Sequence, residues 1–243
     1  MMKTLNLLKS NSPDELSASV ASAWLDEISA ASSSGKPHFV ALSGGRITLK
    51  FFAVVIELSK TRNISLNNVH FFWADERCVP PDDKESSFAA ADEHFFRPLA
   101  IAPKNIHRIL GEKFPDDAAR LANMEIKGTV PLNATGQPVF DIVFLGMGED
   151  GHVASLFPDE AEAARLDPAI YRAIGNSPKP PPNRVTLGYA AIAAAKNVWV
   201  LASGAGKEVA LRESLSLEGK TPLARVLKMS SSAKVFTDIC LES

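Results

Sequence analysis

The sequence has few cysteines, no long apolar run and no excess of charge of either sign, and each shortage excludes a class of protein. Cys78 and Cys240 form no CxxC pair and no disulfide framework, so we expect a reducing, cytoplasmic location. Residues 1–10 lack an apolar core and no run approaches ~20 apolar residues, which predicts neither a signal peptide nor a membrane span. The formal net charge of −2 does not favour nucleic acid or an anionic membrane as a partner.

Metal-ligand spacing and internal repeats are also missing. The histidines and carboxylates show no pattern such as HExxH, and the two cysteines are far apart, so no metal site is predicted. Serine-rich residues 29–34 and proline-rich residues 178–182 predict loops, because periodic segments resume at once. With 46% hydrophobic residues, the 243-residue chain can bury one substantial core, and we expect residues 1–243 to form a single domain.

Apolar strand-like runs alternate with helix-like periodicity along the chain. This alternation predicts an α/β fold with a mostly parallel, Rossmann-like sheet and helices on both faces. The predicted strands are 39–42, 69–74, 106–110, 139–145, 185–187, 197–202 and 233–237. The predicted helices are one capped by Ser12 with apolar residues up to Ile28, then 49–60, 88–99, 116–127 closed by Gly128, and 208–217.

Glycine or polar clusters directly follow four of these strands. In parallel sheets, ligands bind outside the carboxyl ends of the strands, so the four clusters should share one edge of the sheet. This places seven residues in one candidate site: Gly44, Gly45, Asp75, Arg77, Asp150, His152 and Lys207.

His152 lies on a loop with three glycines after a strongly apolar strand. A titratable imidazole in this position is typical of a catalytic base, and a strand-to-helix turn with a solvated histidine is the alternative. The local residues favour neither, whereas the three other clusters at the same edge favour the base.

The same edge carries groups suited to an anion. Ser43-Gly44-Gly45 between a strand and a helix offers backbone N–H groups and a helix N-terminus. Arg77, Arg184 and Lys207 add positive charge, as does Arg46. For Arg184, a ligand contact and a solvated charge at the rim of a strand are equally supported by the sequence.

Two glycine motifs resemble cofactor sites and are rejected. The fingerprint Gly146-x-Gly148-x-x-Gly151 contains Glu149 and Asp150, which would repel a pyrophosphate, so no nicotinamide is expected. Residues 204–207 lack the spacing of a P-loop, and Glu208 replaces the Ser or Thr that would hold magnesium. We therefore expect no cofactor.

Four segments together resemble the 6-phosphogluconolactonases of the pentose phosphate pathway. They are 41–45, 72–80, 145–158, and 184–187 with 204–207, in the order of that family and across most of the chain. The resemblance implies a sugar-phosphate isomerase-like α/β fold, a metal-free hydrolase and a 6-phosphosugar lactone as substrate. The sequence departs from the family twice: the usual Ser-Gly-Gly-x-Thr-Pro is Ser43-Gly-Gly-Arg-Ile-Thr48, and the usual Ser-Asn pair is Ser86-Ser87.

Two other functions remain as alternatives. The related glucosamine-6-phosphate deaminases carry Asn-Glu-Pro where this chain has Ser155-Leu-Phe-Pro158, and Asp-Glu-Tyr where it has Asp75-Glu-Arg77. Both differences favour the lactonase. A non-catalytic sugar-phosphate sensor on the same fold is disfavoured by the intact Asp150-Gly-His152 and by the lack of an appended DNA-binding segment.

The resemblance, together with the chemistry, predicts roles for the site. Neutral His152 would accept a proton from the attacking water, and Asp150 would orient the imidazole or fix the loop. Gly44 and Gly45 N–H groups, or Arg77, would stabilise the oxyanion. Asp75 would bind sugar hydroxyls or Arg77. Arg184 and Lys207 would hold the phosphate, in a monomer or a small homo-oligomer.

Overall fold

The computed structural model describes residues 4–241. Residues 1–3 belong to the segment 1–10, where no signal peptide is expected, and lie outside the described residues. Its main sheet has six strands in the order β1-β9-β8-β5-β2-β3, and all neighbouring pairs are parallel. The predicted mostly parallel sheet is confirmed. Its strands are β1 (Thr4–Lys9), β2 (His38–Leu42), β3 (Val69–Trp73), β5 (Ile142–Gly146), β8 (Asn197–Ala202) and β9 (Ser232–Thr237).

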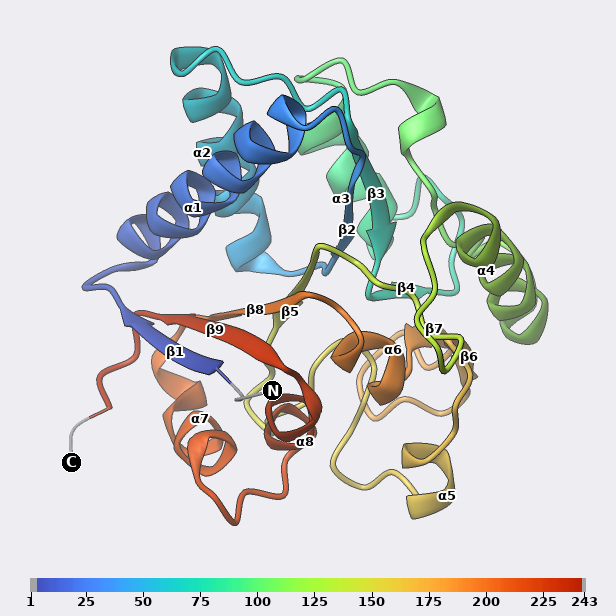
Figure 1. The fold of residues 1–243 in the computed structure, drawn as a ribbon. Coiled ribbons are helices and arrows are strands. Elements are labelled where there is room, and N and C mark those ends of the chain that lie inside the picture. Colours follow the sequence, from blue (N-terminus) through green and yellow to red (C-terminus); the bar gives the residue numbers. More distant parts are fainter. Residues whose placement is uncertain (1–3, 242–243) are drawn as a thin grey trace.

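Helices cover both faces of this sheet (Figure 1). On one face lie α1 (Pro13–Ser33), α2 (Arg46–Thr61), α3 (Ser87–Ala91) and a π-helical turn at Asp92–Phe96. On the other lie α6 (Tyr189–Ala193), α7 (Glu208–Leu215) and α8 (Pro222–Met229), and the short 3-10 turns are Pro103–Asn105 and Ala205–Lys207. Because both faces are covered, β2 is buried at every position.

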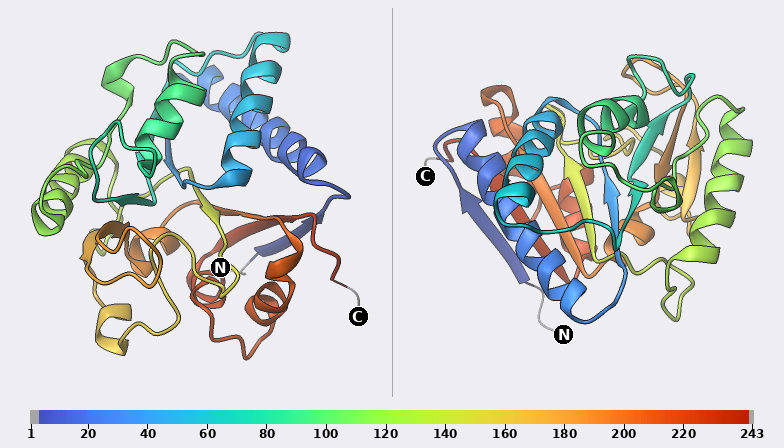
Figure 2. Two further views of the ribbon diagram at one scale, coloured as in Figure 1. Left: turned by 180° about the vertical axis from the view of Figure 1, so that it is seen from behind. Right: turned by 90° about the horizontal axis from the view of Figure 1, so that it is seen from above.

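A second, antiparallel sheet stands beside the carboxyl ends of the main strands (Figure 2). It consists of β4 (Asp75–Arg77), β7 (Arg184–Leu187) and β6 (Tyr171–Ile174), and α4 (Pro115–Thr129) packs against it. The short helix α5 (Glu162–Arg165) lies in the connection before β6. The Leu187 N–H donates to Ala74 O at 2.7 Å, which ties this sheet to the end of β3.

α1 begins as its sequence predicts. The Ser12 hydroxyl accepts the Glu15 N–H at 3.2 Å, and Pro13 occupies the first turn. The apolar positions Leu16, Val20, Trp24 and Ile28 are all buried against the sheet.

Several predicted elements are wrong in type or extent. The strand expected at 106–110 is a single bridge between Ile106 and Phe71, which follows a 3-10 turn. Gly128 does not close α4, which continues to Thr129. The helix expected at 88–99 changes to a π-helical turn and ends at Phe96.

The two edges of the main sheet differ. At the β3 edge, the Asn105 side chain donates to Asn67 O and Val69 O, and the Ile106 bridge adds a further contact. At the other edge β1 pairs only with β9, and all six of its residues are exposed. β1 was not among the predicted strands.

We expect Leu25→Ala on α1 to destabilise the fold by about 2–5 kcal/mol, because its fully buried side chain would leave a cavity. Urea unfolding measures this change. Leu217→Ala is the matched control, since Leu217 is 92% exposed, and should stay within about 0.5 kcal/mol. Equal effects of the two substitutions would contradict the assigned core.

Candidate active site

The carboxyl ends of β2, β3, β5 and β8 border an open cavity of about 420 Å³. It lies where the strand order changes direction, between β2 and β5. Of the eight residues predicted for the site, seven line this cavity: Gly44, Gly45, Asp75, Arg77, His152, Arg184 and Lys207. The eighth, Asp150, does not line the cavity but is hydrogen-bonded to His152, which does.

Asp150 and His152 form a hydrogen-bonded pair at the end of β5. The His152 Nδ1 lies 2.5 Å from Asp150 Oδ1, which also accepts the His152 N–H at 3.2 Å. Burial opposes ionisation of Asp150, but these hydrogen bonds outweigh it and lower the pKa of the carboxyl. An ionised Asp150 fixes the proton of the imidazole on Nδ1 and leaves Nε2 as an acceptor.

Gly148 makes this pair possible. A Cβ at residue 148 would lie 2.1 Å from His152 Nδ1 and 2.7 Å from Asp150 Oδ1. The loop is held by Gly148 N–H to His152 O at 2.9 Å and by Leu223 N–H to Gly151 O at 3.1 Å. The imidazole also contacts the Phe157 ring, with centroids 5.0 Å apart. Gly148, which belongs to the rejected nucleotide fingerprint, therefore leaves the space that the His152 imidazole occupies.

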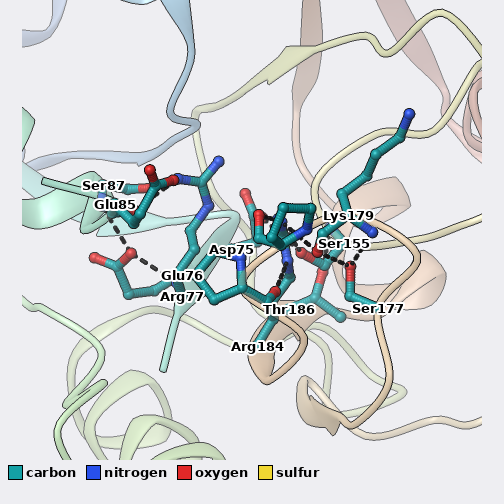
Figure 3. Close-up of polar contacts among 12 residues, drawn as sticks. Asp75, Glu76, Arg77, Glu85, Ser87, Ser155, Ser177, Lys179, Arg184 and Thr186 are labelled. Atoms are coloured by element: carbon teal, nitrogen blue, oxygen red, sulfur yellow. Dashed lines mark hydrogen bonds and ion pairs between the residues drawn. The ribbon is translucent and has the colours of Figure 1, made fainter. Parts of the chain in front are cut away.

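The Asp-Glu-Arg segment alternates between two environments because it is a strand. Asp75 and Arg77 line the cavity, whereas Glu76 lies on the opposite side of β4. There its carboxylate accepts the N–H groups of Arg77 and Ser87 (Figure 3). It also accepts the Phe88 N–H and the Ser86 hydroxyl. Glu76 thus caps α3 and does not line the cavity.

Asp75 is held by two polar groups beneath the cavity. Its Oδ2 accepts the Ser155 hydroxyl at 2.7 Å and lies 3.8 Å from Arg184 Nη1. The expected contact with Arg77 is not formed: Arg77 donates instead to Glu85 O at 2.7 Å. Because Ser155 is fully buried and donates to a carboxylate, it is not placed as a nucleophile.

Arg184 is only 4% exposed, so the alternative of a solvated rim charge is wrong. Its guanidinium donates to the carbonyl oxygens of Lys179, Pro180 and Pro181 and to Ser155 Oγ (Figure 3). Burial lowers the pKa of Arg184, and Asp75 opposes this effect. Arg184 therefore ties the 179–181 turn to Asp75 while still bordering the cavity.

The N-terminus of α2 and two cations form the opposite wall. Gly45 has φ of 120°, a conformation that favours glycine, and no side chain caps the first N–H groups of the helix. Burial lowers the pKa of Lys207, and the positive charge of Arg46 lowers it further. Neither Arg46 nor Lys207, the two cations of this wall, forms an ion pair within residues 4–241. This wall suits an anion.

Ser87, where the sequence departs from the resembling family, lies behind this wall. Its hydroxyl is buried without a hydrogen-bond partner among the described residues, and a Cβ built on Gly44 would approach it to 2.7 Å.

Within the described part of the chain no group of three or more His, Cys, Asp or Glu side chains is arranged to hold a metal ion. Nor is any helix there long and apolar enough to cross a membrane.

Comparison with known proteins agrees with this geometry. Residues 11–236 match the sequence model of the glucosamine-6-phosphate isomerases/6-phosphogluconolactonase family. A Streptomyces coelicolor 6-phosphogluconolactonase is 33% identical over 213 residues, covering 85% of this chain and 81% of that protein. A chloroplastic Arabidopsis thaliana 6-phosphogluconolactonase is 32% identical, covering 82% of this chain but only 62% of the plant protein.

A solved structure of 6-phosphogluconolactonase from Trypanosoma brucei superimposes with a TM-score of 0.82 at 29% identity. The superposition covers 97% of this chain and 95% of that chain. The similarity therefore extends over nearly the whole fold, including both sheets.

We expect Gly148→Ala to displace His152, because the added methyl would overlap the imidazole. The NMR signal of the proton between His152 Nδ1 and Asp150 should then be lost while the fold persists. Gly128→Ala is the control: it adds a methyl to α4 where no atom lies within 4 Å, so it should leave that signal unchanged. Retention of the signal in Gly148→Ala would refute the role assigned to this glycine.

Proposed function

Because the chain belongs to the family of glucosamine-6-phosphate isomerases and 6-phosphogluconolactonases, we propose that it hydrolyses 6-phospho-D-glucono-1,5-lactone to 6-phosphogluconate. The observation that carries the proposal is the Asp150–His152 pair at the wall of the cavity. With Nδ1 bonded to Asp150, Nε2 of His152 is the nitrogen that can accept a proton from an attacking water molecule, and ester hydrolysis needs such a base.

In the proposed reaction His152 Nε2 accepts a proton as the water oxygen bonds to the lactone carbonyl carbon. The negative charge that develops on the carbonyl oxygen is stabilised by the N–H groups of Gly44 and Gly45 or by Arg77. When the intermediate collapses, the bond between the carbonyl carbon and the ring oxygen breaks. The ring oxygen takes the proton back from His152 and becomes the free hydroxyl of 6-phosphogluconate.

Asp150 acts in this scheme by holding the imidazole in the tautomer that can accept a proton. Its lowered pKa keeps it ionised well into the acidic range, so it stabilises the imidazolium that forms during the reaction. No acyl-enzyme is needed, which fits the burial of Ser155.

The remaining residues bind the substrate. Asp75 keeps Oδ1 available for a sugar hydroxyl, since Ser155 and Arg184 approach Oδ2. In this scheme Lys207 and the N-terminus of α2, which border the cavity, bind the phosphate together with Arg184. No metal or nicotinamide enters the scheme. A cytoplasmic location and a monomer or small homo-oligomer stay predictions.

Deamination of glucosamine 6-phosphate is the second candidate, because the same family includes that activity. Asp75, the residue in the base position of the deaminase resemblance, is here hydrogen-bonded to Ser155 and paired with Arg184. The segment Ser155–Pro158 supplies no further carboxylate where the deaminases carry one. Both features favour the lactonase.

His152→Ala should lower kcat by about 10²–10⁴-fold, because the general base is lost while the partly exposed His152 side chain is not part of the core. Stopped-flow hydrolysis of freshly generated lactone measures the change after subtraction of spontaneous opening. Circular dichroism checks that the variant is folded. An unchanged rate in a folded variant would overturn the assignment of the base.

The wild-type protein should open the phosphorylated lactone and release almost no ammonia from glucosamine 6-phosphate. Parallel assays with both substrates at equal concentration test the proposed function directly. Ammonia release at a rate comparable to lactone opening would favour the deaminase. Failure to accelerate either reaction would favour the non-catalytic sensor.

A further inference from the structure

Arg46 occupies a position on the cavity wall that the catalytic scheme does not use. It is the first residue of α2, it lines the cavity together with Lys207, and it is exposed. The acidic side chains that act on Lys207 are Glu149 and Asp238, and neither forms an ion pair with Arg46 or Lys207. Among residues 4–241, Arg46 and Lys207 therefore border one cavity without a direct ion pair, although Glu149 and Asp238 offset part of the charge of Lys207.

Ile47 completes this departure from the family pattern. Where the pattern has a Thr, Ile47 lines the same cavity with an aliphatic side chain and offers no hydroxyl. It is 9% exposed and belongs to the core cluster, so its side chain adds packing beneath the α2 N-terminus. The next residue, Thr48, does not restore the donor, because its hydroxyl donates to Gly44 O at 3.3 Å.

We propose that Arg46 is a specificity-determining residue that binds the phosphate of the substrate by charge, at a part of the cavity where Ile47 offers no hydroxyl donor. The inference rests on the proposed function. A phosphate monoester carries close to two negative charges at neutral pH, which the two cations and the α2 dipole together can balance. Arginine can in addition donate two parallel hydrogen bonds to phosphate oxygens.

Lys50 does not provide the same charge, although it lies one turn further along α2 and lines the cavity. Its ammonium group is 2.5 Å from Asp14 Oδ1, so that its charge is already balanced. Arg46 is therefore the unpaired α2 cation at the cavity in the described structure. Because the contact is solvent-accessible, it should be weakened by salt more strongly than a hydrogen bond from a hydroxyl.

The test compares Arg46→Ser with the double variant Arg46→Ser/Ile47→Thr, which restores a small residue and the Thr of the family pattern. Lys60→Ser is the matched control, since it removes one positive charge from the other end of the same helix. Binding of 6-phosphogluconate and of unphosphorylated gluconate is measured by calorimetry at low and high salt. KM and kcat for the lactone are measured in parallel.

Arg46→Ser should weaken binding of 6-phosphogluconate and raise KM by about tenfold or more, with a smaller change in kcat, because the phosphate keeps its charge throughout the reaction. The double variant should recover most of the affinity, and its affinity should depend less on salt than that of the wild type. Lys60→Ser should change affinity by less than about twofold.

Three results would overturn the proposal: an effect of Arg46→Ser no larger than that of Lys60→Ser, an equal loss of gluconate binding, or equal salt dependence of the wild type and the double variant. These results are separable from the lactonase assignment. Phosphate-dependent binding through Arg46 without lactone opening would refute only the lactonase. Lactone opening that is unaffected by Arg46→Ser would refute only the role of Arg46.

Discussion

The parallel pairing of β2 with β5 is the contact on which the site depends. Val40 lies opposite Ile142 and Ala41 opposite Val143, so the two strands end side by side. The turn after β2 carries Gly44 and Gly45, and the loop after β5 carries Asp150 and His152. One register therefore sets the anion-binding helix terminus against the base. A slip of this pairing would move the two apart, even with every side chain retained.

The residues at the strand ends were predictable because parallel strands deliver their loops to one edge, and this argument needs only strand positions. His152, Lys207 and the glycines followed from it. Local pattern could not show that Asp75–Arg77 is itself a strand. Its pairing with β7 depends on residues more than 100 positions later. The contacts of Arg184 could not be predicted either. They depend on the conformation of the turn that precedes it and on the position of Ser155, 29 residues earlier.

Three mispredictions, one element that was missed, one with the wrong extent and one with the wrong type, share a physical cause. β1 is exposed at all six positions, so it shows no buried face in the sequence. α3, which precedes the π-helical turn, has an unusual N-terminal cap, the Glu76 carboxylate. Glu76 is distant from the helix in sequence and belongs to the second sheet. The false strand at 106–110 arose because apolar residues there pack against the β3 edge without forming a ladder. In each case a long-range contact overrides the local preference.

The pairing of β1 with β9 joins the two ends of the chain, since Thr4 lies opposite Ser232. During synthesis on the ribosome β1 emerges first, yet its strand partner emerges near the end. The β1 backbone must therefore stay unpaired while α1 and the strands between β2 and β8 assemble. A contact of such high sequence separation is slow to form, so closure of the sheet by β1 is expected to be a late step of folding. β1 thus completes the main sheet after the other strands have assembled.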